Sequence, residues 1–216
     1  MTFTEENYLK EIYHLSLDMP GEITANAIAG RLNTKAATVT DMLKKLFEKK
    51  WIDYAPYQGV KLTRKGKSLA LEIVRKHRLW EVFLVQKLEM SWTEVHEIAE
   101  QLEHIQSDLL IDRLDKFLGF PRFDPHGDPI PDTKGNIMSQ YQKSILELTV
   151  NAKASVAGVK LHTPQFLNHL EKIGLVIGRE FRISERNEFD DSMTLLLDDN
   201  QKIIISKEVS KNVLIA

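Results

Sequence analysis

The stretch ITANAIAGRLNTKAATVTDMLKKLFEKK, residues 23–50, has the apolar spacing of two short helices joined by a tight turn. Ile28 and Leu32 lie four positions apart in the first half, and Val39 and Leu43 repeat that spacing in the second. Apolar residues that recur every three or four positions line one face of a helix. The outer side of the second helix is polar and basic. The stretch therefore predicts a helix-turn-helix, whose second helix enters the major groove of DNA.

A β-hairpin is expected directly after this pair of helices. Residues 51–55 and 60–63 alternate as strands do, and residues 56–59 form a turn signal between them. A hairpin at that place extends the helix-turn-helix to a winged helix. Another helix is expected before it, over residues 4–17.

The net charge of −2 is small, but the charges are unevenly distributed. Residues 31–67 contain ten Lys or Arg against three Asp or Glu, whereas residues 81–115 contain two against nine. This asymmetry indicates a part that binds a polyanion, followed by a part with another task. A solvated basic helix is the alternative interpretation of the first part.

Side chains at the start of the second helix are expected to meet base edges, and basic side chains farther along it and on the hairpin to meet phosphates. The candidate DNA-binding residues are Lys35, Thr38, Thr40, Lys44, Lys45, Lys61 and Arg64.

The sequence pattern of the remaining chain changes at two places, near residues 119 and 144. Long helices are expected over residues 65–88 and 91–118, and their apolar surface favours a partner subunit. Residues 119–136 hold four of the seven prolines and predict an ordered, irregular connection. Beyond residue 144 the pattern is typical of short strands and one helix, which favours a small β-barrel. The expected strands are residues 145–150, 154–161, 180–186, 192–198 and 202–209, and the helix is 164–174.

The segment EVHEIAEQLEHIQSDL, residues 94–109, concentrates side chains that can bind metals. On a continuous helix, two imidazoles and two carboxylates share an arc of roughly a quarter turn. Imidazole with carboxylate suits Mn(II), Fe(II) and Zn(II). The polar face of an ordinary amphipathic helix is the alternative. The four residues are His96, Glu100, Glu103 and His104, and His77 with Glu81 forms a similar pair on the preceding helix.

Several classes of protein are disfavoured by what the sequence lacks. Without cysteine there are no disulfides and no thiolate zinc sites. No apolar run approaches the ~18–20 residues that cross a bilayer, and the N-terminus lacks the order of a secretion signal, so a cytoplasmic protein is expected. Neither a Gly-rich phosphate loop nor a nucleophile elbow is present, and a metal-dependent hydrolase using the His and Glu residues is the less favoured reading.

Three segments in this order, RKHRLWE (75–81), LEH (102–104) and FPRFDPHGDPIP (120–131), resemble the diphtheria-toxin-repressor family, especially its manganese-responsive branch. The resemblance implies a mainly α fold with a small β part. It implies a winged helix-turn-helix domain (1–65), a helical metal-binding and dimerisation domain (66–136) and an SH3-like, FeoA-type domain (137–216). It also implies a homodimer that binds a divalent metal and then a palindromic operator, repressing genes for metal uptake.

The resemblance implies two sets of ligands. A primary site would use Asn7, Glu100, Glu103 and His104, and would link the DNA-binding domain to the dimerisation domain. Lys10 matches the position of a further carboxylate in some relatives and cannot ligate as an ammonium, so a two-metal centre there is not expected. The second site would use His77, Glu81, His96, Asp124, His126, His162 and Gln165.

Oxygen and imidazole ligands without sulfur favour Mn²⁺ as the cofactor. Fe²⁺ is the alternative, and Zn²⁺ or other divalent ions are expected to substitute in vitro. A metal-independent winged-helix protein, whose acidic helices only mediate dimerisation, is the remaining reading.

Overall fold

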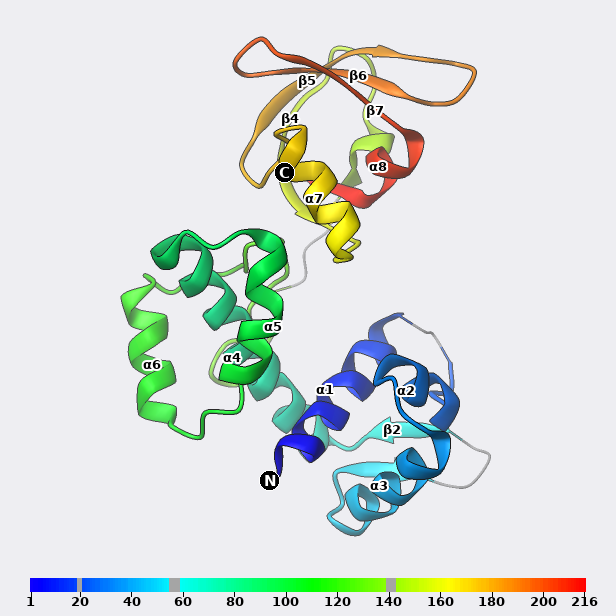
Figure 1. The fold of residues 1–216 in the computed structure, drawn as a ribbon, viewed down its shortest axis with the longest axis vertical. Helices are drawn as coiled ribbons and strands as arrows, with labels where there is room; N and C mark the ends of the chain where they lie inside the picture. Colours follow the sequence, from blue (N-terminus) through cyan, green and yellow to red (C-terminus); the bar gives the residue numbers. More distant parts are fainter. Residues whose placement is uncertain (19–20, 55–58, 139–142) are drawn as a thin grey trace. The chain divides into compact units, whose positions relative to one another are not determined.

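The computed structural model describes residues 1–216 except 19–20, 55–58 and 139–142, and except the side chain of Thr93 (Figure 1). The described chain forms two compact units, and each is described by itself. The N-terminal unit comprises Met1–His77, Glu100–Asp112 and Pro131–Ile137, and the C-terminal unit comprises Arg78–Ala99, Arg113–Ile130 and Met138–Ala216.

The N-terminal unit contains the predicted helix-turn-helix and the strands of its wing. Thr24 caps the first of the paired helices, because its hydroxyl accepts a hydrogen bond from the Ala27 N–H at 3.1 Å. Fully buried Ile28, Leu43 and Leu46 join the pair to the first helix in one apolar core. The expected turn of the wing lies largely outside the described residues. The elements are α1 (Phe3–Asp18), α2 (Ala25–Arg31), α3 (Ala36–Glu48) and antiparallel β1 (Ile52–Tyr54) and β2 (Val60–Leu62).

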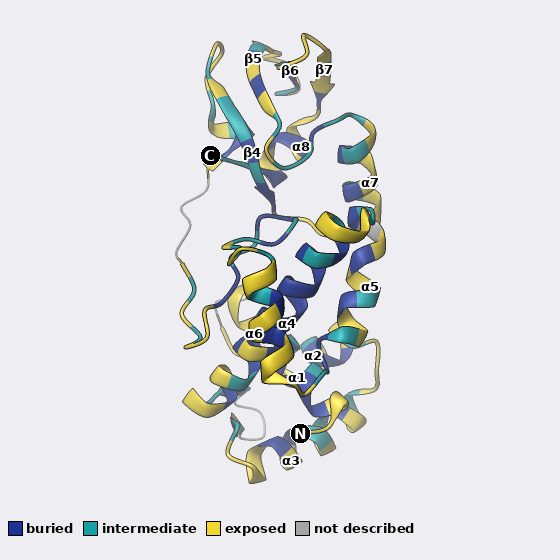
Figure 2. Ribbon diagram, turned by 90° about the vertical axis from the view of Figure 1, so that its left-hand side faces the viewer, coloured by how far each residue is buried: buried dark blue, intermediate teal, exposed yellow. Residues whose placement is uncertain are grey.

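Helix α4 (Arg64–Leu88) follows the wing directly and is buried over most of its length (Figure 2). Its start lies close against the wing. A Cβ added to Gly66 would come 1.8 Å from the Trp51 carbonyl oxygen, so only glycine fits there. The Thr63 hydroxyl accepts a hydrogen bond from the Gly66 N–H at 3.1 Å, which caps this first turn.

The single helix expected over residues 91–118 is wrong. The structure has two helices there, α5 (Trp92–Leu102) and α6 (Asp108–Phe117), with residues 103–107 between them. The Ser107 hydroxyl accepts a hydrogen bond from the Leu110 N–H at 3.3 Å and starts α6. Because α5 ends at Leu102, Glu103 and His104 do not continue the helical arc of His96 and Glu100 that the sequence predicted.

The C-terminal unit contains a six-stranded antiparallel sheet in the order β3-β8-β4-β5-β6-β7. Helices α7 and α8 contribute Leu170 and Val209 to the core that covers it. The mainly α fold class with a small C-terminal β part is confirmed. The elements are β3 (Lys143–Ser144), β4 (Lys153–Val159), α7 (Pro164–Lys172), β5 (Glu180–Arg186), β6 (Met193–Leu197), β7 (Lys202–Ile205), α8 (Lys207–Asn212) and β8 (Val213–Ile215).

Two predicted strands of this unit are wrong in detail. Ile145–Glu147 is a 3₁₀ helix, because Ser144 and Glu147 form a capping box at its start. The strand expected over 202–209 ends at Ile205, since the Ser206 hydroxyl accepts from the Val209 N–H and starts α8. Within the described residues, no helix is long and apolar enough to cross a bilayer.

Candidate metal centres and DNA-binding surface

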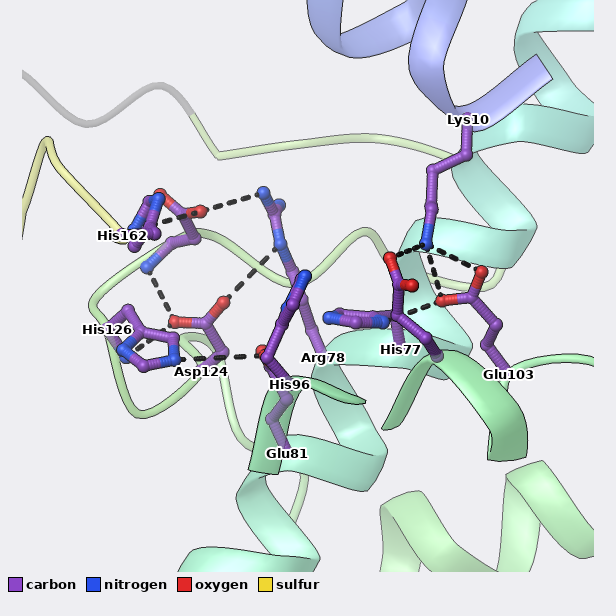
Figure 3. Close-up of polar contacts among 11 residues, drawn as sticks. Lys10, His77, Arg78, Glu81, His96, Glu103, Asp124, His126 and His162 are labelled. Carbon is purple, nitrogen blue, oxygen red and sulfur yellow. Dashed lines mark hydrogen bonds and ion pairs between the residues drawn. The ribbon is translucent and has the colours of Figure 1, made fainter. Parts of the chain in front are cut away.

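A buried ammonium group lies at the centre of one cluster of candidate ligands, which belongs to the N-terminal unit. Lys10 Nζ of α1 lies 2.7 and 2.9 Å from the two carboxylate oxygens of Glu103 and 3.1 Å from Glu100 Oε1 (Figure 3). The Lys10 side chain is 5% exposed and that of Glu103 is fully buried. We call this group the Lys10 cluster; its members are Glu6, Lys10, His77, Glu100, Glu103 and His104.

Lys10 carries its positive charge at neutral pH. Burial opposes that charge, but the negative charges of Glu103 and Glu100 and the hydrogen bonds to them outweigh it. The pKa of Lys10 therefore lies above its ordinary value.

The rest of the Lys10 cluster joins α1 to the segment after α5. His77 Nδ1 lies 2.6 Å from Glu103 Oε2, and His104 Nδ1 contacts Glu6 Oε2. Gln106 donates to the other oxygen of Glu6 at 2.7 Å. Sequence reasoning missed Glu6 because it considered only Asn7 and Lys10 of α1. The spacing of Glu6 and Lys10, four positions apart on one helix face, was the available signal.

Three of the four residues predicted for the primary site come together here, namely Glu100, Glu103 and His104. Asn7 is half-buried, and none of the described polar contacts between α1 and this cluster involves it. Nor does the set fit a metal ion as it stands, because an ammonium already binds both Glu103 oxygens and one of Glu100. The primary site of Asn7, Glu100, Glu103 and His104 stays a prediction.

A second cluster belongs to the C-terminal unit. Glu81 of α4 is buried, and its Oε1 lies 3.5 Å from His96 Nδ1 of α5 and 3.8 Å from His126 Nε2. His77 precedes Glu81 by one turn of α4 and belongs to the N-terminal unit, so its part in a second site stays a prediction. We call the residues of the C-terminal unit the His126 cluster; they are Glu81, His96, Asp124, His126 and His162.

The segment FDPHGDP is folded into a tight loop that positions His126. Buried Asp124 accepts hydrogen bonds from the N–H groups of His126 and Asp128 at 2.8 and 2.9 Å. Gly127 has a φ of +89°, and a Cβ there would come 2.2 Å from the Ala157 carbonyl oxygen. The loop is thus pressed against β4, where the Val159 N–H donates to the His126 carbonyl oxygen at 2.9 Å. Only glycine allows this approach.

Arg78 holds the same loop from α4. Its guanidinium lies 3.1 Å from Asp128 Oδ2 and 3.5 Å from Asp124 Oδ2, and it donates to the Pro129 carbonyl oxygen at 2.6 Å. Burial and the nearby charges of Glu81 and Asp128 nevertheless raise the pKa of Asp124 well above its ordinary value, against the effect of Arg78. A cation beside Asp124 and Glu81 would favour their charged forms.

The imidazole of His126 has the properties of a metal ligand. Its Nδ1 atom is buried and has no hydrogen-bond partner in the described structure. Burial lowers the pKa of His126 to about 4, although the charge of Glu81 opposes this, so the ring is neutral at pH 7. A neutral imidazole beside buried carboxylates is the donor set that Mn(II), Fe(II) and Zn(II) bind. The His126 cluster therefore fits a divalent metal ion.

The two ligands predicted from the C-terminal β part differ in their contacts with the His126 cluster. The His162 ring lies 5.3 Å from the His126 ring, and its Nε2 atom lies 3.9 Å from Asp128 Oδ2. Gln165, in the first turn of α7, is exposed and no described contact joins it to the cluster. Trp92 packs edge-on against His126, with ring centroids 5.7 Å apart, and shields it from solvent.

The candidate DNA-binding residues all lie in the N-terminal unit. Six of the seven are exposed, at the N-cap of α3, on α3, on β2 and at the start of α4; they are Lys35, Thr38, Lys44, Lys45, Lys61 and Arg64. Thr40 differs, because it is half-buried and its hydroxyl donates to the Ala36 carbonyl oxygen at 2.9 Å within α3. Its hydroxyl hydrogen is therefore occupied by the helix. Contact with DNA stays a prediction for the set.

Three family models match the chain. Residues 1–60 match the N-terminal DNA binding domain of iron dependent repressors, and residues 63–132 match their metal binding and dimerisation domain. Residues 143–216 match the FeoA domain.

Individual relatives agree with these models. The chain is 32% identical to a manganese-dependent transcriptional repressor solved in complex with manganese, with a TM-score of 0.82, over 98% of this chain and 99% of that one. The manganese regulator SloR is 35% identical, with a TM-score of 0.72 over 100% and 99%. The iron-dependent repressor IdeR of Mycobacterium leprae is 34% identical over 158 residues, 73% of this chain and 63% of that protein. The match thus spans less than two thirds of IdeR.

Proposed function

The chain belongs to the iron-dependent repressor family, and on that premise we propose that it is a metal-dependent transcriptional repressor that binds double-stranded DNA as a homodimer. The observation that carries the proposal is the His126 cluster. A buried, neutral imidazole with an unpartnered nitrogen lies beside buried carboxylates, which is a costly arrangement unless a cation joins it.

The residues that would hold the ion are Glu81, His96 and His126, with Asp124 and His162 beside them. A divalent cation bound there would supply positive charge that keeps the buried carboxylates ionised. Contacts within the chain hold the candidate ligands in position. Arg78 and the two backbone N–H groups fix Asp124, and Gly127 presses the loop onto β4, so the ligands are held before any ion arrives.

The proposed ion is Mn²⁺, with Fe²⁺ as the alternative. The cluster offers oxygen and nitrogen only, and harder ligands favour Mn²⁺ over ions that prefer sulfur. The names of the relatives include both manganese and iron. Affinity alone favours Zn²⁺ over both, so Zn²⁺ is expected to bind in vitro.

DNA binding is assigned to α3 and the wing. The exposed residues at the start of α3 would meet base edges in the major groove, and Lys44, Lys45, Lys61 and Arg64 would meet phosphates. A homodimer places two such helices on a palindromic operator, with half-sites spaced by one helical turn of about 34–36 Å or a multiple. Leu88, Phe117 and Phe120 of the C-terminal unit are more than half exposed, as apolar residues of a subunit interface are before association.

The hydrolase alternative has no specific support, since the relatives named above are transcriptional regulators. The metal-independent alternative predicts equal DNA affinity in Mn²⁺ and in chelator, and the experiment below tests this.

The test measures DNA binding and metal binding in parallel. The probe is the DNA directly upstream of the protein's own gene, in gel-shift titrations with Mn²⁺, with Fe²⁺ and with chelator. We expect at least tenfold tighter binding with Mn²⁺ than with chelator, and loss of that difference in His126→Ala. His169→Ala replaces an exposed histidine of α7 in the same unit and is the matched control. Equal DNA affinity in Mn²⁺ and in chelator would refute metal dependence.

A further inference from the structure

Lys10 occupies the position in the N-terminal unit where a metal ion was predicted. Its Nζ atom bonds both oxygens of Glu103 and one of Glu100, at 2.7 to 3.1 Å. The neighbouring carboxylate on α1, Glu11, lies 3.1 Å from Arg31 and so has a cation of its own. The Lys10 ammonium is therefore directed to Glu100 and Glu103.

A divalent ion and this ammonium cannot share the same oxygens. An ammonium has no lone pair and never ligates a metal, and its charge repels another cation at the same carboxylates. Lys10 also holds an advantage that no free ion has. A group tethered on the same chain acts at an effective concentration of roughly 1 mM or more, whatever the metal supply.

The polar side chains of the Lys10 cluster also form hydrogen bonds with other side chains of the same unit. His77 bonds the Glu103 carboxylate at 2.6 Å, and Glu6 receives His104 and Gln106. The fully buried Glu103 thus has an ammonium and an imidazole beside it, both from the chain. Unlike His126, none of these side chains is among the described buried groups that lack a partner.

We propose that Lys10 is a built-in cation that replaces a metal ion between α1 and the residues Glu100 and Glu103. The attachment of α1 is then permanent and independent of metal. It follows that the chain binds one regulatory ion, at the His126 cluster, instead of two. The number of ions rests on the proposed function, whereas the attachment of α1 does not.

The first experiment counts manganese bound to the full-length protein, by calorimetric titration and by elemental analysis after dialysis. We expect one Mn²⁺ per chain for the natural protein and for Lys10→Arg, which keeps the charge. Lys10→Glu leaves three carboxylates facing one another, which must recruit a cation, so we expect two Mn²⁺ per chain. The second ion should disappear when Glu103→Gln is added.

The second experiment measures hydrogen exchange of the α1 amides in chelator. We expect protection in the natural protein and exchange faster by about tenfold or more in Lys10→Met, because buried Glu103 loses its cation. Lys76→Met is the matched control, since Lys76 is equally buried in the same unit but pairs with half-exposed Glu72 at 2.9 Å. If Lys10→Met does not fold, Glu100→Gln removes the 46%-exposed partner and should give a smaller change in the same direction.

The outcomes separate the two proposals. Two Mn²⁺ on the natural protein, one of them lost in Glu103→Gln, would overturn the role of Lys10 and leave the repressor proposal standing. Unchanged α1 exchange in Lys10→Met would also overturn it. A natural protein that binds no Mn²⁺ would refute the proposed function, and the exchange measurement would still decide the role of Lys10.

Discussion

The Lys10 cluster and the His126 cluster are both built from carboxylates and imidazoles around one buried glutamate, and they differ in the groups that face that glutamate. Arg78 lies beside Asp124 in the second cluster, whereas His96 and His126 lie beside Glu81. In the Lys10 cluster an ammonium of α1 lies 2.7 Å from a fully buried carboxylate. In the His126 cluster Glu81 lies against His96 and His126, and the latter is neutral at pH 7.

The difference teaches how one chain can make one acidic cluster structural and another responsive. A covalently attached cation is always present, so we infer that the first cluster joins α1 to the segment after α5 with or without metal. Under the proposed function, the neutral ring with an unpartnered nitrogen binds a cation from solution, and the second cluster then responds to metal supply. Four changes test this contrast, in order of decreasing expected effect.

Removing the ammonium should have the largest effect. Lys10→Met leaves the buried carboxylate of Glu103 without its cation, and breaking such a pair costs about 3–5 kcal/mol. We expect the free energy of unfolding in urea to fall by about that amount in chelator. Lys76→Met should cost much less, because Glu72 is half-exposed. Equal losses in the two variants would mean that Lys10 has no special role.

Disturbing the loop of the His126 cluster comes next. Gly127→Ala forces a left-handed φ on alanine and drives its Cβ into the Ala157 carbonyl, so we expect a loss of about 3 kcal/mol and weaker Mn²⁺ binding. Gly178→Ala is the control, since Gly178 has a φ of +81° with open space around it, and should cost about 1 kcal/mol. Thermal unfolding measures both, and no difference between them would contradict the close packing on β4.

His126→Ala tests the responsive cluster without disturbing its backbone. We expect Mn²⁺ affinity to fall by about 100-fold in calorimetric titration, which is about 2.7 kcal/mol, because a ligand is lost. The urea stability in chelator should fall less than in Lys10→Met, because the lost ring packs against Trp92 and His162 but leaves no buried carboxylate without its cation. Natural affinity in His126→Ala would remove this residue from the ligand set.

The smallest effect is expected on the DNA-binding surface. Lys44 is exposed on α3, so Lys44→Ala should weaken DNA binding by a few-fold and lower the salt dependence by about one unit. Because this contact is separate from both clusters, the loss should be the same with Mn²⁺ and with chelator. Lys172→Ala, on α7 of the C-terminal unit, is the control in gel shifts over a range of salt concentrations. A loss confined to the Mn²⁺ condition would show that α3 itself responds to the metal.

Local patterns predicted much of this molecule correctly. The paired helices at 23–50, the wing strands and the strand at Glu180–Arg186 follow from apolar spacing, since each element repeats with its own period. The same patterns failed at the end of α5. Leu102 ends the helix although no proline or glycine follows, and the Ile105 N–H then donates to the Leu102 carbonyl oxygen at 3.1 Å in a turn. Beyond this turn the side chains of Glu103 and His104 contact His77 and Glu6, and no local pattern announces those contacts.

The sequence alone determined the paired helices with the wing after them, the basic outer face of α3, and the set of imidazoles and carboxylates that a metal could use. Only the tertiary structure decided how those ligands are divided. Lys10 and Glu103 are 93 positions apart, and no local period relates them; they meet because α1 and the end of α5 pack in one unit. The attraction between charges depends on their distance in space, and burial strengthens it, so only folding decides which carboxylates face Lys10 and which face His96 and His126.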